Sequence, residues 1–166
     1  YTSGGRHESV AEHSWRLALM AYRVGDEFPE LDMDRVVRMC LIHDLGECFT
    51  GDIPSFLKSG EDESAEQSAL AQWVGALPEP YRTQMRELYA EMDALATPEA
   101  RLYKALDKLE AVIQHNESDI KTWIPREYEL NMTYADENVA FSPYLTALRR
   151  EIRNDTAAKI KAAEAE

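Results

Sequence analysis

Apolar residues recur along this chain at the three- and four-residue spacing of helices that bury one face. In the first such segment, Ser9 and Glu12 have the spacing of a capping box, in which a hydroxyl and a carboxylate bond the first free N–H groups of a helix. The pattern therefore predicts a helix that begins after Ser9 and runs to about Phe28, where Pro29 ends it.

A second helix is predicted from Asp32, whose side chain can cap it, to Gly46, where a stop is expected. Within it, residues 36–42 are apolar apart from Arg38, which is typical of a helix buried on most of its surface. Residues 49–60 contain Gly, Pro and Ser residues that favour a loop between this helix and the next.

Four more helices are predicted, two over about residues 62–76 and 80–95, and two after the caps Thr97 and Ser142, each followed by proline. No segment alternates between apolar and polar residues as a half-buried strand would. With 166 residues, 45% of them hydrophobic, the chain can bury the core of one domain. We therefore predict an all-α bundle of about six to seven helices in a single domain, residues 1–166. Further N-terminal residues are expected, because the chain does not begin with Met.

The acidic balance of the chain limits its partners, because 31 Asp and Glu against 18 Lys and Arg give a net charge of −13. Nucleic-acid polymers and anionic membranes require basic surface, so neither is expected as a partner. The longest apolar stretch is far below spanning length and nothing resembles a signal peptide, which favours the cytoplasm. The two cysteines, Cys40 and Cys48, form neither a disulfide framework nor a zinc motif. Any anion site must therefore be local, built from a metal ion or a few basic residues.

Two adjacent polar residues, His43 and Asp44, end the apolar run of the second predicted helix. A charged carboxylate in such a place is costly unless it is paired or binds a metal ion. The two side chains can flank one point, since adjacent helical positions lie ~100° apart. Alternatively they form a His–Asp pair at a helix end near the surface, and the doublet alone leaves both interpretations open.

Two further polar residues, His13 and Asp107, interrupt the apolar faces of predicted helices. Taken singly, His13 is compatible with a core histidine, and Asp107 with an ion pair to Lys104, Lys108 or Arg101. Together with the doublet they supply two imidazoles and two carboxylates on three helices. Such a mixed set suits a divalent ion such as Mn, Fe, Co, Ni or Zn, with Mg also open, and suits Ca less.

The order of these residues is similar to that of a known family. The chain has R-x-E-S-V-A-E-H-S at residues 6–14, H-D-L-G-E at 43–47 and T-G-D at 50–52. Over roughly residues 5–120 it resembles the HD-domain metal-dependent phosphohydrolases, and within them the 5′-deoxynucleotidase branch. The resemblance implies a metal site with four ligands: His13, His43, Asp44 and Asp107.

The resemblance also implies roles for residues near the metal. Glu47 falls where an acidic residue lies beside the metal-bound water, Asp52 where a second carboxylate meets the substrate, and Arg6 where an arginine meets the phosphate. Lys58, in the same loop as Asp52, is a further candidate for substrate binding. Gly51 permits a tight turn that would direct Asp52 over the metal. Alternatively, Glu47 is a solvated residue at a helix end, Asp52 a turn aspartate and Arg6 a surface charge.

Motif residues that the sequence lacks exclude some branches of the family. No histidine occurs from residue 44 to 114, so a site for one metal ion is favoured over a site for two. The Gly-Tyr-Pro motif of the cyclic-dinucleotide phosphodiesterases is absent, and Cys48 stands where alarmone hydrolases carry a second acid. His7 and His115 lie outside the family pattern and are expected at the surface.

The sequence therefore predicts a phosphohydrolase that removes phosphate from a nucleotide, foremost a deoxyribonucleoside 5′-monophosphate. One alternative is the same chemistry on another small phosphorylated metabolite. A second is a regulatory module that binds metal or nucleotide without turnover, although such a module would not need both Glu47 and Asp52. The resemblance favours a homodimer. Apolar and aromatic residues over 81–92 and 128–144 would form the dimer face, or else pack the core.

Overall fold

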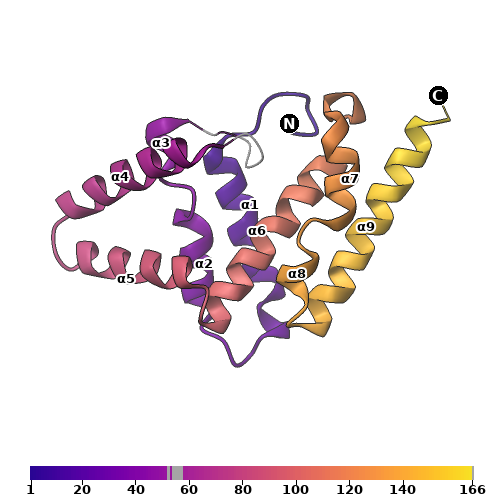
Figure 1. Ribbon diagram of the computed structural model, residues 1–166. Helices are drawn as coiled ribbons and strands as arrows, with labels where there is room; N and C mark the ends of the chain where they lie inside the picture. Colours follow the sequence, from indigo (N-terminus) through magenta and orange to yellow (C-terminus); the bar gives the residue numbers. More distant parts are fainter. Residues whose placement is uncertain (52, 54–57, 166) are drawn as a thin grey trace.

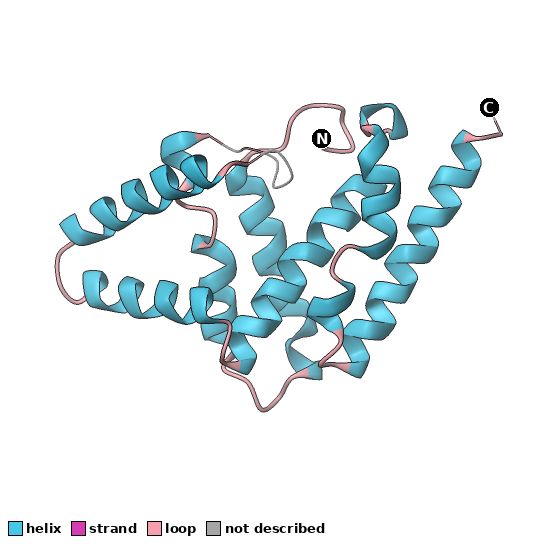
Figure 2. Ribbon diagram, in the orientation of Figure 1, coloured by secondary structure: helices cyan, strands magenta, loops and turns pink. Residues whose placement is uncertain are grey.

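The computed structural model describes residues 1–51, 53 and 58–165, and within these residues every regular element is a helix (Figure 2). The elements are α1 (Val10–Val24), η1 (Gly25–Glu27), α2 (Met33–Ile42), α3 (Glu47–Thr50), α4 (Gly60–Ala76), α5 (Tyr81–Ala94), α6 (Pro98–Glu117), η2 (Ile120–Thr122), α7 (Pro125–Thr133), α8 (Asp136–Val139) and α9 (Pro143–Ala163). The all-α prediction is confirmed, and the described residues form seven α-helices of nine or more residues, two four-residue α-helices and two 3-10 turns. None of the described helices is long and apolar enough to cross a membrane.

Helix α6 is the centre of the bundle and contacts α1, α2, α5, α8 and α9 (Figure 1). Its start follows the predicted signal, because the Thr97 side chain accepts a hydrogen bond from the backbone N–H of Ala100 and proline occupies the first helical position. Leu102, Leu106 and Leu109 are fully buried. Each such leucine contributes roughly 1.5–3 kcal/mol by leaving water, which is why this helix forms the core.

Helices α1 and α2 pack against each other and against α6. The predicted capping box of α1 is present, with Ser9 and Glu12 bonding each other's backbone N–H groups. Leu17 and Ala21 of α1 are fully buried, as are Val36, Met39 and Cys40 of α2. Burial of α2 on most of its surface was expected, but Leu41 is 49% exposed, so this helix buries one face only.

The end of α2 differs from the prediction. The helix ends at Ile42, whose carbonyl accepts a 2.7 Å hydrogen bond from the Tyr89 hydroxyl, and residues 43–46 form a turn before α3. Gly46 does not end the helix, because its φ is an ordinary −58°. A Cβ at this position would lie 2.7 Å from Cγ of Glu66, so glycine is required for a close approach to α4.

Helices α4 and α5 form a hairpin that projects from the bundle (Figure 1). Both helices were predicted. Ala65, Trp73 and Tyr81 are exposed, whereas Val74 and Leu88 are buried. The reason is geometric: of these two helices only α5 makes substantial contact with α2 and α6, and α4 packs on α3 and α5.

The segment between α6 and α9 folds into α7 and α8, which the sequence did not predict. Their packing depends on polar groups that carry no apolar periodicity. Arg149 of α9 is 2% exposed; its Nη2 donates to the carbonyl of Asn131 at 2.9 Å, and its Nε lies 3.1 Å from Oδ1 of Asp136. A buried charge is tolerated here because it is paired.

Candidate metal centre and cavity

The four predicted ligands converge on one point at the junction of α1, α2 and α6. Nε2 of His13 lies 3.2 Å from Nε2 of His43 and 3.2 Å from Oδ1 of Asp107. Nε2 of His43 lies 2.9 Å from Oδ2 of Asp44 and 3.3 Å from Oδ1 of Asp107. In a fifth pair, His13 Nε2 and Asp44 Oδ2 are 3.6 Å apart.

These separations fit the geometry of one bound cation. Neighbouring ligand atoms that each lie about 2.1 Å from an ion, at angles between octahedral and tetrahedral, are about 3.0–3.4 Å apart. The observed range of 2.9–3.6 Å brackets that value. His13, His43 and Asp44 offer ligand atoms that all lie within 4.8 Å of one another, and Asp107 joins this group through its contacts with the two histidines. The donor set of two imidazole nitrogens and two carboxylates is therefore suited to a single divalent ion.

Both imidazoles are oriented so that Nε2 faces this point. Nδ1 of His43 donates to the carbonyl of Cys40 at 3.0 Å, and Nδ1 of His13 donates to Oε2 of Glu110 at 2.6 Å. With the proton on Nδ1, each ring directs its Nε2 lone pair toward the shared point. Glu110 is 2% exposed and also forms an ion pair with Arg16, whose Nε lies 2.9 Å from its Oε1.

Glu110 was not singled out from the sequence. The available signal was its position three residues after Asp107, which places an acid on the same face of a mostly apolar helix. Lys104 was considered only as a partner of Asp107, and it is one: its Nζ lies 2.8 Å from Oδ2. Asp107 therefore forms the ion pair with Lys104 through one oxygen, and its other oxygen faces the two histidines of the predicted metal site.

The electrostatics of the cluster favour positive charge at its centre. Burial alone lowers the pKa of His13, but hydrogen bonds to Asp107 and Glu110 outweigh it and raise the pKa to about 10. For His43 burial is likewise outweighed, by hydrogen bonds to Asp107 and Asp44, and the pKa rises to about 9. Burial would raise the pKa of Asp107, yet its bonds to the two histidines hold that pKa well below its usual value. A divalent cation at this point would take the place of these protons.

Glu47 and Lys58 also lie at the site. Both line the cavity, and Nζ of Lys58 is 3.3 Å from Oε1 of Glu47 and forms a second ion pair with Glu66. Gly51, which follows α3, has a φ of +88°, a conformation that favours glycine. Asp52, predicted to meet the substrate, lies outside the described residues.

The structure does not bring Arg6 to the site. Its guanidinium donates to Oε2 of Glu12 at 2.8 Å, its side chain is 61% exposed, and it does not contribute to the cavity wall. The cause is local, because Glu12 is the capping-box carboxylate of α1 and offers Arg6 a partner on the surface. The lysines at the cavity are Lys58 and Lys104.

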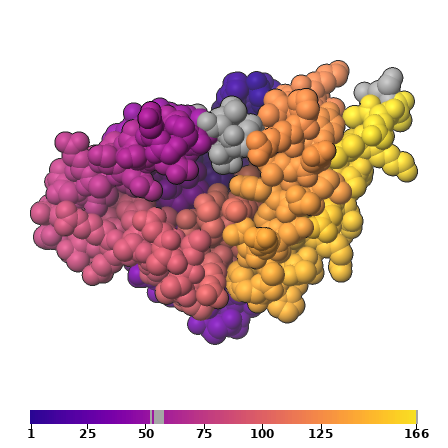
Figure 3. All heavy atoms as spheres, viewed as in Figure 1, coloured from indigo at the N-terminus to yellow at the C-terminus, as the bar shows by residue number. Residues whose placement is uncertain are grey.

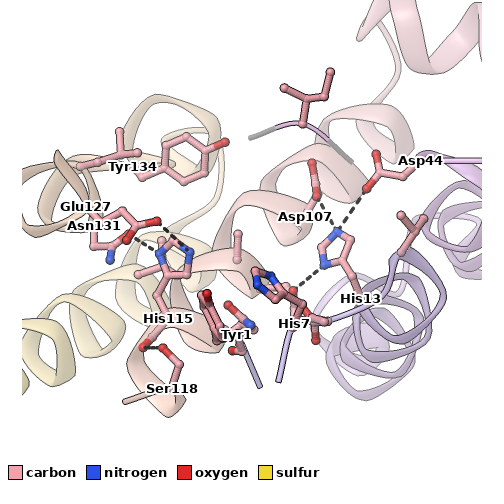
Figure 4. A pocket seen from close by; sticks show the side chains of 18 of the residues that line it. Tyr1, His7, His13, Asp44, Asp107, His115, Ser118, Glu127, Asn131 and Tyr134 are labelled. Atoms are coloured by element: carbon pink, nitrogen blue, oxygen red, sulfur yellow. Dashed lines mark hydrogen bonds and ion pairs between the residues drawn. The ribbon is translucent and has the colours of Figure 1, made fainter. Parts of the chain in front are cut away.

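The cavity continues well beyond the metal cluster. Its volume is about 670 Å³, within the usual range for ligand sites. Figure 3 shows a hollow in the surface between the α3–α4 region and α7. In Figure 4 His13, Asp44 and Asp107 lie to one side of the cavity, and His115, Asn131, Glu127 and Tyr134 lie to the other.

The second group of residues corrects one expectation. His115 was expected at the surface, but it is half-buried and lines the cavity. Its Nδ1 is 3.0 Å from Oδ1 of Asn131, and its Nε2 is 3.8 Å from Oε1 of Glu127. The sequence could not show this, because both partners come from α7, which it did not predict.

Comparison with known proteins places these residues in context. Residues 1–149 match the family described as HD domain. The chain is 36% identical over 119 residues to the 5′-deoxynucleotidase HDDC2 of Homo sapiens, covering 70% of this chain and 57% of that protein. It is 27% identical over 120 residues to the 5′-deoxynucleotidase hdd1 of Schizosaccharomyces pombe, covering 69% and 60%. The chain thus spans less than two thirds of the length of these two relatives.

A solved structure is also similar over most of the chain. The crystal structure of a predicted metal-dependent phosphohydrolase from Magnetospirillum magnetotacticum MS-1 superposes with a TM-score of 0.78 and 29% sequence identity. The match covers 96% of this chain and 82% of the other. The likeness therefore includes α7, α8 and α9 as well as the helices that carry the histidines.

Proposed function

The chain belongs to the HD domain family, and on that premise we propose that it is a metal-dependent phosphohydrolase that releases phosphate from a nucleotide. The proposed substrate is a deoxyribonucleoside 5′-monophosphate, as the names of the relatives suggest. The observation that carries the proposal is the convergence of four side chains at a cavity large enough for a nucleotide, where Nε2 of His13 and Nε2 of His43 each lie within 3.6 Å of both Asp44 and Asp107.

The proposed cofactor is one divalent metal ion held by those four residues. When bound, such an ion activates a water molecule and polarises a phosphoryl oxygen. A second acidic group nearby consists of Glu8, His13 and Glu110. Arg16 already occupies it, with Nε 2.9 Å from Glu110 and Nη1 3.6 Å from Glu8. This arrangement supports one ion rather than two.

The residues of the chain supply the proton transfer and the charge. We assign Glu47 the proton from the attacking water, because it lies at the cavity wall beside the cluster. The water oxygen bonds to phosphorus, the bond from phosphorus to the 5′ oxygen breaks, and that oxygen takes the proton held by Glu47 to leave as the nucleoside hydroxyl. Lys58 and Lys104 supply positive charge to the phosphate side of the cavity. The roles of Asp52 and Arg6 at the substrate remain predictions from the sequence.

Two alternatives from the sequence are less well supported. Another small phosphorylated metabolite would leave much of the 670 Å³ cavity unused. A module without turnover would not need Glu47, which an ion pair with Lys58 holds at the cavity. Neither observation depends on the names of the relatives.

The homodimer, the single domain and the cytoplasmic location also remain predictions. The two segments named for a dimer face contribute buried residues such as Leu88 and Val139, which favours packing of the core. Exposed apolar side chains instead share one face of α1: Trp15, Leu19 and Tyr22. These are the residues to replace in a test of oligomeric state.

The experiment that tests the proposed function is phosphate release from a panel of substrates. Metal-stripped protein would receive Mn, Co, Mg or Zn in turn, with deoxyribonucleoside 5′-monophosphates, ribonucleoside 5′-monophosphates and sugar phosphates as substrates. We expect release from the deoxyribonucleotides with at least one metal and none with EDTA. Release that is fastest from sugar phosphates would favour the first alternative, and no release with any metal would favour the second.

A further inference from the structure

We infer that the nucleoside lies along helix α6, with its base at the end of the cavity formed by His115, Asn131, Glu127 and Tyr134. This inference rests on the proposed function, because it takes the phosphate to lie at the metal cluster. It adds a binding site for the base that is separate from the residues of the reaction. The cavity joins the two sites in one continuous space.

The first support is the register of α6. Asp107, Ala111 and His115 are spaced by four residues, so they lie one turn apart on one side of the helix, and all three line the cavity. The rise from Asp107 to His115 is about 12 Å. A nucleoside monophosphate in extended form spans a comparable length from phosphate to base. A ligand bound through its phosphate near Asp107 therefore reaches His115 without a change in the helix.

The second support is the size of the residue between them. Ala111 presents only a methyl group at the middle of this path. Leu109 and Val112, close to it in the sequence, direct their larger side chains into the core instead. The small side chain leaves room for a sugar between the two ends of the cavity.

The third support is the chemistry at the far end. Asn131 is 1% exposed, and two contacts hold it: its Oδ1 is 3.0 Å from Nδ1 of His115, and its carbonyl accepts from Arg149. The Asn131 Nδ2 has no hydrogen-bond partner among the described residues. Nε2 of His115, at 3.8 Å from Glu127, is beyond hydrogen-bond distance of its neighbour. This end therefore has donor and acceptor capacity that the fold does not use, which suits the edge of a nucleobase.

An aromatic wall accompanies these polar groups. Trp123 lies with its ring centroid 6.1 Å from that of His115, and its Nε1 donates to the His115 carbonyl at 3.0 Å. Tyr134 lies across from His115 in Figure 4. Flat aromatic side chains beside a few fixed polar groups are the usual lining of sites for planar ligands. The contact from Trp123 is to the backbone, so it survives replacement of the His115 side chain.

The test compares substrates with and without a base. For His115→Ala, we expect kcat/KM for a deoxyribonucleoside 5′-monophosphate to fall by about tenfold or more relative to kcat/KM for 2-deoxyribose 5-phosphate. For Ala111→Leu, we expect nucleotide hydrolysis to fall by a similar factor while the affinity for Mn or Co, measured by calorimetry, stays at the wild-type value. The same Ala→Leu change at exposed Ala90 of α5 is the control and should alter neither quantity.

The results separate this inference from the proposed function. Equal losses for both substrates in His115→Ala would assign the residue a structural role and overturn the inference, as would unchanged nucleotide hydrolysis in Ala111→Leu. If wild-type protein hydrolyses neither substrate, the proposed function fails. Calorimetric binding of the nucleotide then decides the inference: binding lost in Ala111→Leu and kept in Ala90→Leu supports it, and equal binding in both contradicts it.

Discussion

The two ends of the cavity are built in different ways on the same helix. At the metal end, the four proposed ligands come from α1, α6 and the turn after α2, and Nε2 of each histidine lies within 3.6 Å of both carboxylates. At the far end, His115 of α6 meets Asn131 and Glu127 of α7 through one hydrogen bond and one longer contact. The groups whose spacing the proposed reaction depends on are thus positioned by three separate elements. The proposed recognition of the base involves α6 and α7 instead.

The largest effect is expected from a change at the metal end that keeps the ligands. Glu47→Gln removes the proposed proton acceptor but keeps a side chain of the same size. We expect kcat to fall by about 10²–10⁴-fold. Metal binding measured by calorimetry should stay as in the wild type, since Glu47 is not among the four ligands. Loss of metal together with activity would instead identify Glu47 as a ligand.

A smaller effect is expected from the support of His13. Glu110→Gln weakens the acceptor that fixes the proton on Nδ1 of His13, and we expect metal affinity to fall by roughly 10–100-fold. Glu117→Gln is the matched control, because Glu117 bonds the same Arg16 at 2.9 Å but does not contact the histidine. Equal loss of metal affinity in both variants would mean that the affinity depends on the ion pairs of Arg16 rather than on the hydrogen bond between Glu110 and His13.

Replacement of Arg149 should weaken the packing of α7 at the far end of the cavity without a change at the metal end. Arg149→Met removes the donor to the Asn131 carbonyl and the partner of Asp136, and we expect the free energy of unfolding to fall by about 2 kcal/mol. Asp136 keeps Arg153 at 2.6 Å, which limits the loss. Urea denaturation measures the stability. In the folded variant KM for the nucleotide should rise while metal affinity is unchanged, and a matching loss of metal affinity would argue that the two ends are coupled.

The smallest effect concerns the start of α1, which carries His13. Hydrogen bonds from Arg6 and Ser9 lower the pKa of Glu12 from 4.5 to about 2. Because the folded-state pKa is depressed, the stabilisation is present above the unfolded value and is lost as the pH falls through about 2. Wild-type protein should therefore lose more stability than Glu12→Gln on acidification from about pH 5 to about pH 2. Parallel denaturation curves for the two proteins would contradict this.

The sequence predicted the metal end far better than the far end, and the reason is physical. His13, His43, Asp44 and Asp107 each interrupt or end an apolar face, so they stand out against a clear helical pattern. Their spacing also matched a known family. Short-range patterns of this kind are visible without the fold.

What the sequence did not show depends on contacts between distant segments. Glu110 is explained only by its bond to His13, and His115 only by its neighbours on α7. Helix α7 itself is stabilised by a proline start, a Glu127 cap and the buried Arg149, none of which produces apolar periodicity. For Arg6 the sequence predicted a contact that the structure does not show. Its position in the motif suggested a phosphate contact, but its guanidinium is bound at the surface by the capping carboxylate of Glu12.

The most direct test of the account is a metal titration with two readouts on the same samples. Stripped protein would be titrated with Mn or Co while bound metal and phosphate release from a deoxyribonucleoside 5′-monophosphate are measured together, for wild type and for Asp107→Ala. We expect activity and bound metal to rise in parallel and to saturate at one equivalent per chain, with neither appearing in the variant. Full activity in metal-free protein, or in Asp107→Ala, would contradict the proposal that this single site performs the reaction.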